Sequence, residues 1–311
     1  MDLNLPKTDH REVETVIKQG IRRNFARRAG SYDRQAGVQR LMAQGLLARL
    51  AGALPRTGRV LEIGCGTGYF TGLLKQHGNG ASLVALDLDP VLVAAARQRL
   101  GAPRRVAWLV ADGETLSRGC FNAIVANASF QWLTRPADSL AAYHGLLNPG
   151  GILAFSTLGP GTFRELAGSL AQAATALHLS APPAIAAQGF LDEAVWKELL
   201  ETAGFRRVEV DREWVTITHA SVPVFLKSLQ ATGATNPQPR PFSPRLLKAM
   251  IQAYQEGYGE GGVIPVSYEI IWAVARKGRG QGPGGRGQGP VRATRGVARW
   301  LPGPVKINGR P

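Results

Sequence analysis

VLEIGCGTGYF, residues 60–70 of this 311-residue chain, is typical of a strand that runs into a glycine-rich loop and then into a helix. Gly64, Gly66 and Gly68 let the loop turn tightly, and they let a ligand approach the backbone with no Cβ in the way. The start of the following helix offers free N–H groups and a positive potential, which suit a carboxylate. The segment therefore predicts a ligand-binding loop at the end of a buried strand.

Four more short apolar runs follow, and helical patterns separate them. The runs are SLVALD (82–87), RVAWLV (105–110), FNAIVAN (121–127) and ILAFST (152–157). Their lengths and β-branched content predict fully buried parallel strands. Between them, Asp89 and Pro90 are suited to begin a helix over 90–100, and a second helix is expected over 136–147. This alternation predicts a doubly wound α/β sheet with right-handed crossovers.

The flanking segments add helices and two more strands. Helical patterns cover 13–54, 162–179, 190–205, 222–229 and 244–254, and strand patterns cover 206–220 and 266–275. We therefore expect one domain over residues 1–277. It would hold an N-terminal helical lid at about 13–54, a core over 59–157, and a substrate-side insertion with the final strands over 158–277.

The net charge of +15 lies mostly at the C-terminal end. Nine of the 37 Lys and Arg residues, and none of the 22 Asp and Glu residues, fall within residues 276–311, so residues 1–275 carry only +6. Residues 278–311 are rich in Gly, Pro and Arg, and this composition predicts a disordered tail because few apolar side chains are available to offset the entropy of ordering. A solvated extension is favoured over an RGG-like nucleic-acid contact.

Several other classes of protein are disfavoured. Cys65 and Cys120 are the only cysteines, too few for a disulfide framework or a cysteine-rich metal site. The N-terminus has no apolar stretch typical of a secretory signal, and no segment reaches the ~18 apolar residues of a membrane span. We expect a cytoplasmic monomer without a metal ion.

The spacing of the glycine loop distinguishes two kinds of ligand. Dinucleotide enzymes use G-x-G-x-x-G, whereas this loop reads G-x-G-x-G with Tyr69 at the position of the last glycine. Asp87 ends the second strand, where a carboxylate can accept both hydroxyls of an adenosine ribose. Leu88 can supply an apolar surface for adenine, and Asp112 at the end of the third strand can accept from the adenine amine. The alternative for either acid is an ordinary capping turn, but the three features together favour an adenosine ligand.

The segments LEIGCGTG, ALDLDP, VADGETL and ANASFQW resemble the motifs of class I S-adenosylmethionine-dependent methyltransferases. The resemblance implies a Rossmann-like α/β fold with a mainly parallel seven-stranded sheet, N-terminal helices and a helical insertion after the fifth strand. It also implies a cofactor, S-adenosyl-L-methionine. The residues that it assigns to cofactor binding are Glu62, Gly64, Gly66 and Gly68 around the methionine part, Asp87 at the ribose, Asp112 at the adenine, and Asn127 beneath the sulfonium. Leu88 and Gly113, next to these acids, are further candidates for cofactor binding.

A narrower resemblance covers residues 21–277. The segments RRNFARRAGSYDRQAGVQ, ASFQWL, LAFSTLGPGTFREL, SLQATGA and PVSYEIIWAVARK are similar, in the same order, to the malonyl-acyl-carrier-protein O-methyltransferases of biotin synthesis. The implied reaction transfers a methyl group to the free carboxylate of a malonyl thioester, on the carrier protein or on coenzyme A. The tail departs from the family pattern.

Such a reaction needs no general base, because a carboxylate with a reference pKa near ~4 is already ionised at neutral pH. Tyr32, Phe130 and Trp132 are candidates for the walls of a dry site, since aromatic faces tolerate a sulfonium and Tyr32 can donate a hydrogen bond. We expect Tyr32 and Trp132 to act in catalysis, the alternative for each being core packing.

Two basic pairs, Arg22-Arg23 and Arg27-Arg28, lie in the N-terminal helical segment. Carrier proteins are acidic, so these pairs, Arg23 and Arg27 above all, are candidates for docking the carrier; the alternative is a solvated helix face. Other functions stay open at this stage. They are a class I methyltransferase for another small acid or a quinone precursor, a protein-modifying assembly factor of the same fold, and a nucleic-acid-binding protein that acts through its tail.

Overall fold

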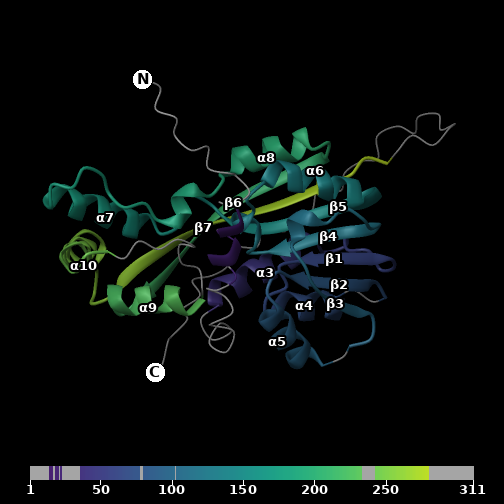
Figure 1. Ribbon diagram of the computed structural model, residues 1–311, viewed down its shortest axis with the longest axis horizontal. Helices are drawn as coiled ribbons and strands as arrows, with labels where there is room; N and C mark the ends of the chain where they lie inside the picture. The colour runs from purple at the N-terminus through teal and green to yellow at the C-terminus, as the bar shows by residue number, and fades with distance from the viewer. Residues whose placement is uncertain are drawn as a thin grey trace, which may run out of the picture. The chain divides into compact units, whose positions relative to one another are not determined.

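The computed structural model describes residues 14–16, 18–20, 22, 36–77, 80–101, 103–232 and 242–279. The chain divides into two compact units, residues 1–279 and 280–311, and the second lies outside the described residues. Within the first unit, seven strands form one sheet in the order β3-β2-β1-β4-β5-β7-β6 (Figure 1). The five strands up to β5 are parallel, whereas β7 is antiparallel to both β5 and β6. The predicted seven-stranded, mainly parallel sheet is therefore confirmed.

Most strand positions agree with the sequence pattern. The strands are β1 (Arg59–Ile63), β2 (Ser82–Asp87), β3 (Val106–Val110), β4 (Phe121–Asn127), β5 (Leu147–Leu158), β6 (Arg206–His219) and β7 (Ile264–Arg276). The prediction of full burial is wrong for β3. This strand lies at the edge of the sheet, and Leu109 and Val110 are 41% and 50% exposed. An edge strand has a neighbour on one side only, so side chains on it stay accessible.

Helices cover both faces of the sheet. On one face lie α3 (Gly37–Arg49), α4 (Tyr69–His77) and α5 (Pro90–Leu100), with Met42, Leu46 and Phe70 packed on β1, β4 and β5. On the other face lie α6 (Pro136–Leu146) and α8 (Glu193–Thr202), where Tyr143 and Trp196 are fully buried. The helix α5 has the predicted bounds, because Asp89 accepts from the Val91 N–H at 2.7 Å and caps its start.

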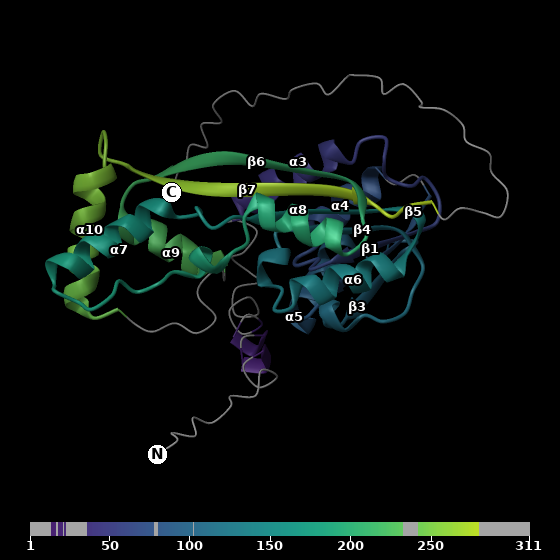
Figure 2. The same cartoon turned by 90° about the horizontal axis from the view of Figure 1, so that it is seen from above.

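The strands β6 and β7 run past the sheet and carry a cluster of three helices (Figure 2). These are α7 (Arg164–Ala176), α9 (Val222–Thr232) and α10 (Pro244–Tyr258). Phe225, Met250 and Tyr254 from α9 and α10 are fully buried there against β7. The insertion after the fifth strand is thus confirmed for α7, and α9 and α10 add to it after β6. The helix α10 continues four residues beyond its predicted end at Tyr254.

The turn after β5 is built around one buried carboxylate from β7. Glu269, 3% exposed, accepts from the Gly161 N–H at 2.7 Å, and the Gly159 N–H donates to its backbone oxygen at 2.9 Å. A Cβ on Gly159 would lie 2.6 Å from the Glu269 carboxyl carbon, so this turn needs glycine. No helix among the described residues is long and apolar enough to cross a membrane.

Candidate cofactor site

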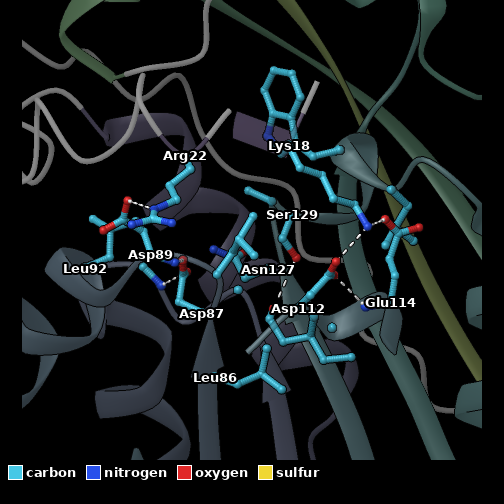
Figure 3. Close-up of a pocket in the computed structure, with 18 residues that line it drawn as sticks. Lys18, Arg22, Leu86, Asp87, Asp89, Leu92, Asp112, Glu114, Asn127 and Ser129 are labelled. Carbon is cyan, nitrogen blue, oxygen red and sulfur yellow. Dashed lines mark hydrogen bonds and ion pairs between the residues drawn. The ribbon is translucent and has the colours of Figure 1, made fainter. Parts of the chain in front are cut away.

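A pocket lies at the carboxyl ends of β1, β2, β3 and β4 (Figure 3). Strand order reverses between β1 and β4, and ligands of open α/β sheets bind at this kind of switch point. The lining includes most of the predicted cofactor residues: Gly64, Gly66, Asp87, Leu88, Asp112, Gly113 and Asn127, together with Trp132. Glu62 and Gly68 do not line it.

The three loop glycines have different tasks, although all have positive φ, between 53° and 84°. A Cβ on Gly64 would lie 2.6 Å from the Ser129 Cβ, and one on Gly68 would lie 3.0 Å from the Ala96 Cβ. These two glycines therefore permit close packing of the protein on itself. A Cβ on Gly66 would meet no atom within 4 Å, so Gly66 leaves open space above the loop backbone.

Asp87 joins the ends of β1 and β2. Its Oδ2 accepts from the Gly66 N–H at 2.9 Å, and its Oδ1 accepts from the Asp89 N–H at 3.0 Å. Burial raises the pKa of this carboxyl, and the two N–H donors oppose the rise. Each carboxylate oxygen has a second lone pair, so Asp87 can still accept from a ligand hydroxyl.

Glu62 lies beneath the loop and not in the pocket. It is 1% exposed and accepts from the Thr71 hydroxyl of α4 at 2.6 Å. Burial raises the pKa of Glu62 to about 8. Glu62 thus holds the helix that follows the loop. It would support the methionine part of a ligand through that helix and not by direct contact.

Asp112 and Gly113 form the third-strand end of the pocket. Asp112 Oδ1 accepts from the Glu114 N–H at 2.9 Å, which leaves Oδ2 for other donors. A Cβ on Gly113 would lie 2.8 Å from Ile63 Cγ2, so only glycine permits this approach to β1. The Lys18 ammonium, 94 residues away in sequence, donates to Asp112 Oδ2 at 2.7 Å, so this oxygen is accessible to N–H donors from other segments.

Sequence reasoning missed Glu114. Its carboxylate accepts from the backbone N–H groups of Thr134 and Arg135 at 3.1 and 2.8 Å, and from the Thr134 and Ser139 hydroxyls at 2.8 and 3.2 Å. The helix α6 has Arg135 at its N-cap position with no side-chain cap of its own, so Glu114 supplies the missing acceptor from a distant loop. The signal was that Arg135, and not Ser, Thr, Asp or Asn, directly precedes Pro136.

Asn127 and Trp132 line the pocket from the β4 side. The Asn127 amide donates to the Gln39 carbonyl at 3.1 Å and accepts from the Ser156 hydroxyl at 2.7 Å, which holds the side chain in one orientation. Trp132 packs edge-on against Phe190, with 5.7 Å between ring centroids. Phe130 was a candidate wall residue, and this prediction is wrong. It is 1% exposed and packs against Tyr143 and Phe155 in the core.

A second, smaller cavity adjoins the glycine loop on the α3 side. It shares Gly64, Gly66 and Asn127 with the first pocket, and Gln39, Arg40 and Tyr69 also line it. The glycine loop therefore lies between two cavities.

The remaining predicted residues fall on segments that the structure does not describe. Tyr32, Arg23, Arg27 and Arg28 lie outside the described residues. Arg22 is described, and it lines the cofactor pocket, with its Nε 3.6 Å from Asp89 Oδ2.

Comparisons with known proteins agree with this geometry. A family model described as a methyltransferase domain matches residues 32–210. A malonyl-acyl-carrier-protein O-methyltransferase of Anoxybacillus flavithermus is 38% identical over 266 residues, covering 84% of this chain and 98% of the relative. Relatives of the same name from Paenibacillus sp. and Geobacter sulfurreducens are 35% and 32% identical, covering 82% and 84% of this chain and 97% and 100% of the relatives.

Solved structures share the fold at low sequence identity. The YcgJ protein of Bacillus subtilis has a TM-score of 0.53 and 14% identity, covering 76% of this chain and 99% of that one. A phosphoethanolamine N-methyltransferase 2 of Haemonchus contortus, solved in complex with S-adenosyl-L-methionine, has a TM-score of 0.51 and 17% identity. The match covers 80% of this chain and 56% of that one.

Proposed function

Because this chain belongs to the malonyl-acyl-carrier-protein O-methyltransferase family, we propose that it transfers a methyl group from S-adenosyl-L-methionine to the free carboxylate of a malonyl thioester. The thioester is malonyl-acyl-carrier protein, and the product enters biotin synthesis, as the family resemblance implies. The observation that carries the proposal is the pocket itself, in which Gly66, Asp87 and Asp112 meet at the ends of three adjacent strands.

The residues of the pocket fit S-adenosylmethionine part by part. The open space above Gly66 accommodates the polar amino-acid end, near the N-terminus of α4, whose positive potential suits a carboxylate. Asp87 offers acceptors for the two ribose hydroxyls, and Asp112 Oδ2 offers one for the adenine amine. Leu88 and Leu133 supply apolar surface for the adenine ring.

When bound, S-adenosylmethionine supplies an electrophilic methyl group. The protein has to hold the carboxylate oxygen in line with that group and exclude water, since orientation can supply up to ~7–11 kcal/mol of a barrier. Trp132 lines the pocket, where an indole face tolerates a nearby sulfonium. Asn127, fixed by Gln39 and Ser156, presents a rigid polar group at the same wall.

No residue is required to remove a proton, because the attacking carboxylate is ionised at neutral pH. A strong Arg clamp on the attacking oxygens would stabilise the ground state and slow the reaction, so we assign no arginine to that position.

Tyr32 is proposed as a second wall of the site. Arg23 and Arg27 are proposed to dock the acidic carrier protein, and the enzyme is proposed to act as a monomer in the cytoplasm.

The test is methyl transfer from S-adenosylmethionine with a labelled methyl group. The enzyme is incubated separately with malonyl-acyl-carrier protein, malonyl-CoA, aconitate and RNA. We expect label on the malonyl carrier protein as a base-labile methyl ester, with less on malonyl-CoA. Label on aconitate or RNA alone, with intact cofactor binding, would replace the malonyl proposal by another acceptor.

A further inference from the structure

Lys18 sits at the adenine end of the cofactor pocket and contacts three carboxylates. Its Nζ lies 2.7 Å from Asp112 Oδ2 and 2.7 Å from Glu114 Oε2 (Figure 3). It also lies 2.8 Å from Glu14 Oε1. An ammonium group has three N–H donors, so each one is used on a separate acid. The side chains of Lys18 and Glu114 are only 15% and 4% exposed. Charged hydrogen bonds of this length, sheltered from water, are stronger than exposed ion pairs.

The local charges make Lys18 necessary. Three carboxylates converge within hydrogen-bond distance of Lys18 Nζ, and Arg135 Nε lies 3.4 Å from one of them, at Glu14 Oε2. Burial alone lowers the pKa of Lys18, but the hydrogen bonds that Lys18 donates to Asp112, Glu114 and Glu14 outweigh burial and raise it. The same contacts lower the pKa of Glu114 against the effect of its burial. Lys18 therefore holds the three acids at the pocket edge together.

Arg22 supplies a second contact, and it is helical, as are residues 14–16 and 18–20. Lys18 and Arg22 are four residues apart, so they lie on one face of a helix. That face points into the pocket, because both residues line it and Arg22 Nε lies 3.6 Å from Asp89 Oδ2. Asp89 caps α5 directly after the predicted ribose acid, Asp87. Lys18 and Arg22 thus span the pocket from the β2 end to the β3 end.

We propose that Lys18 is a positioning residue of the cofactor site, which ties the described residues 14–16, 18–20 and 22 to Asp112 and Glu114 and so holds them over the adenosine part of the cofactor. The proposal rests on the proposed cofactor. Asp112 Oδ2 has a second lone pair, so it can accept from Lys18 and from the adenine amine together. Glu114 connects this contact to α6, because the carboxylate that Lys18 contacts also caps that helix.

The experiment compares the full-length wild type with Lys18→Met, Lys18→Arg and the control Lys75→Met, which removes an exposed lysine of α4. Calorimetry gives the dissociation constant of S-adenosylhomocysteine, and stopped flow gives its dissociation rate. We expect Lys18→Met to bind ~10–100-fold more weakly, the scale of hydrogen bonds to charged groups, with most of the change in the dissociation rate. Lys18→Arg should recover part of the affinity, and Lys75→Met should match the wild type.

Steady-state kinetics separates positioning from a loss of fold. Lys18→Met should raise KM for S-adenosylmethionine and leave kcat at or above the wild-type value, because a looser segment releases product faster. Wild-type affinity in Lys18→Met would overturn the role of Lys18 and leave the proposed function standing. An equal loss in Lys75→Met, or no recovery in Lys18→Arg despite a wild-type melting temperature, would also overturn it. A wild type that binds no S-adenosylhomocysteine would instead contradict the proposed cofactor.

Discussion

The carboxylate of Asp87 accepts a hydrogen bond from the backbone N–H of Gly66 at 2.9 Å, which links the acid at the end of β2 to the glycine loop after β1. The same carboxylate accepts from the Asp89 N–H. Asp87 therefore sets the loop conformation as well as offering acceptors to a ribose. In the sequence, the glycine loop and Asp87 were two separate indications of the ligand. In the structure, hydrogen bonds join them into one unit.

The first prediction concerns this unit. Asp87→Asn retains the size of the side chain but turns an amide N–H₂ toward one of the two backbone donors, and it removes the charge. S-adenosylhomocysteine should bind ~10–100-fold more weakly, because ~1.5–3 kcal/mol is the scale of a hydrogen bond to a charged group. Calorimetry measures the loss, and Asp211→Asn on exposed β6 is the control. Unchanged affinity, or tight binding of NAD, would contradict the cofactor assignment.

The second prediction uses two matched glycines. Gly66 and Gly101 have φ of 53° and 71°, and a Cβ on either would meet no atom within 4 Å. Alanine at each should cost at least about 1–2 kcal/mol of folding free energy, because a positive φ disfavours a side chain. The cost should be larger at Gly101, whose ψ of −154° lies in a region essentially restricted to glycine. Only Gly66→Ala should also weaken S-adenosylhomocysteine binding, since its methyl group enters the pocket. Denaturation and calorimetry on both variants test this, and an equal loss of affinity in both would contradict it.

The third prediction is a pH dependence of stability. Burial raises the pKa of Glu62 to about 8, so between about pH 4.5 and pH 8 the folded protein holds a proton that the unfolded chain has released. Stability contributed by this group is present at low pH and is lost as pH rises through that window, by up to ~1.4 kcal/mol per pH unit. Glu62→Gln should remove this loss, so it should gain on the wild type from pH 5 to pH 8 in urea denaturation.

The control for this pH dependence is Glu201→Gln, which changes an exposed carboxylate of α8. Its stability should follow the wild type at each pH. A constant difference between Glu62→Gln and the wild type over the whole range would mean that Glu62 is ionised in the folded protein.

The fourth prediction concerns the C-terminal boundary. The sequence predicts that the folded domain ends at residue 277, whereas hydrogen bonds to the sheet continue to Gly278. The Gly150 N–H bonds to the Lys277 and Gly278 carbonyls, and Lys277 Nζ donates to the His144 and Leu147 carbonyls at 2.8 Å. Truncation after Arg279 should leave melting temperature and methyl transfer unchanged. Truncation after Ala275 removes these contacts and should cost about 1–3 kcal/mol, measured by denaturation. Loss of activity on the first truncation would assign a role to the tail.

Local patterns in the sequence predicted the sheet and much of the site. β2 and β4 have the predicted bounds, because a short apolar run between turn residues is readable without tertiary contacts. Phe130 and Trp132 show what local sequence patterns do not predict. They lie two residues apart in one aromatic motif, and the short 3-10 turn over Phe130–Trp132 sends the first into the core and the second to the pocket. A pattern does not specify that orientation.

Lys18 shows the same limit over a longer range. It contacts Asp112, 94 residues away in sequence, and nothing around either residue indicates the pairing. Glu114 likewise caps a helix that begins more than 20 residues later. Such contacts follow from the packing of elements, which sequence periodicity alone does not fix.

The last prediction concerns the carrier protein. Because Arg22 contacts Asp89 in the pocket, Arg23 and Arg27 are the proposed docking residues. Reversing both to Glu should slow transfer to malonyl-acyl-carrier protein much more than transfer to a short malonyl thioester, which presents no acidic surface. Added salt should slow the wild type on the carrier alone, because exposed charges are screened over ~8–10 Å. Circular dichroism and S-adenosylhomocysteine affinity of the double variant must match the wild type. Otherwise the slower transfer could come from a disturbed Lys18 contact and not from lost docking. Equal losses on both substrates with the fold intact would place these arginines in the active site, and no loss on either would leave them as a solvated face.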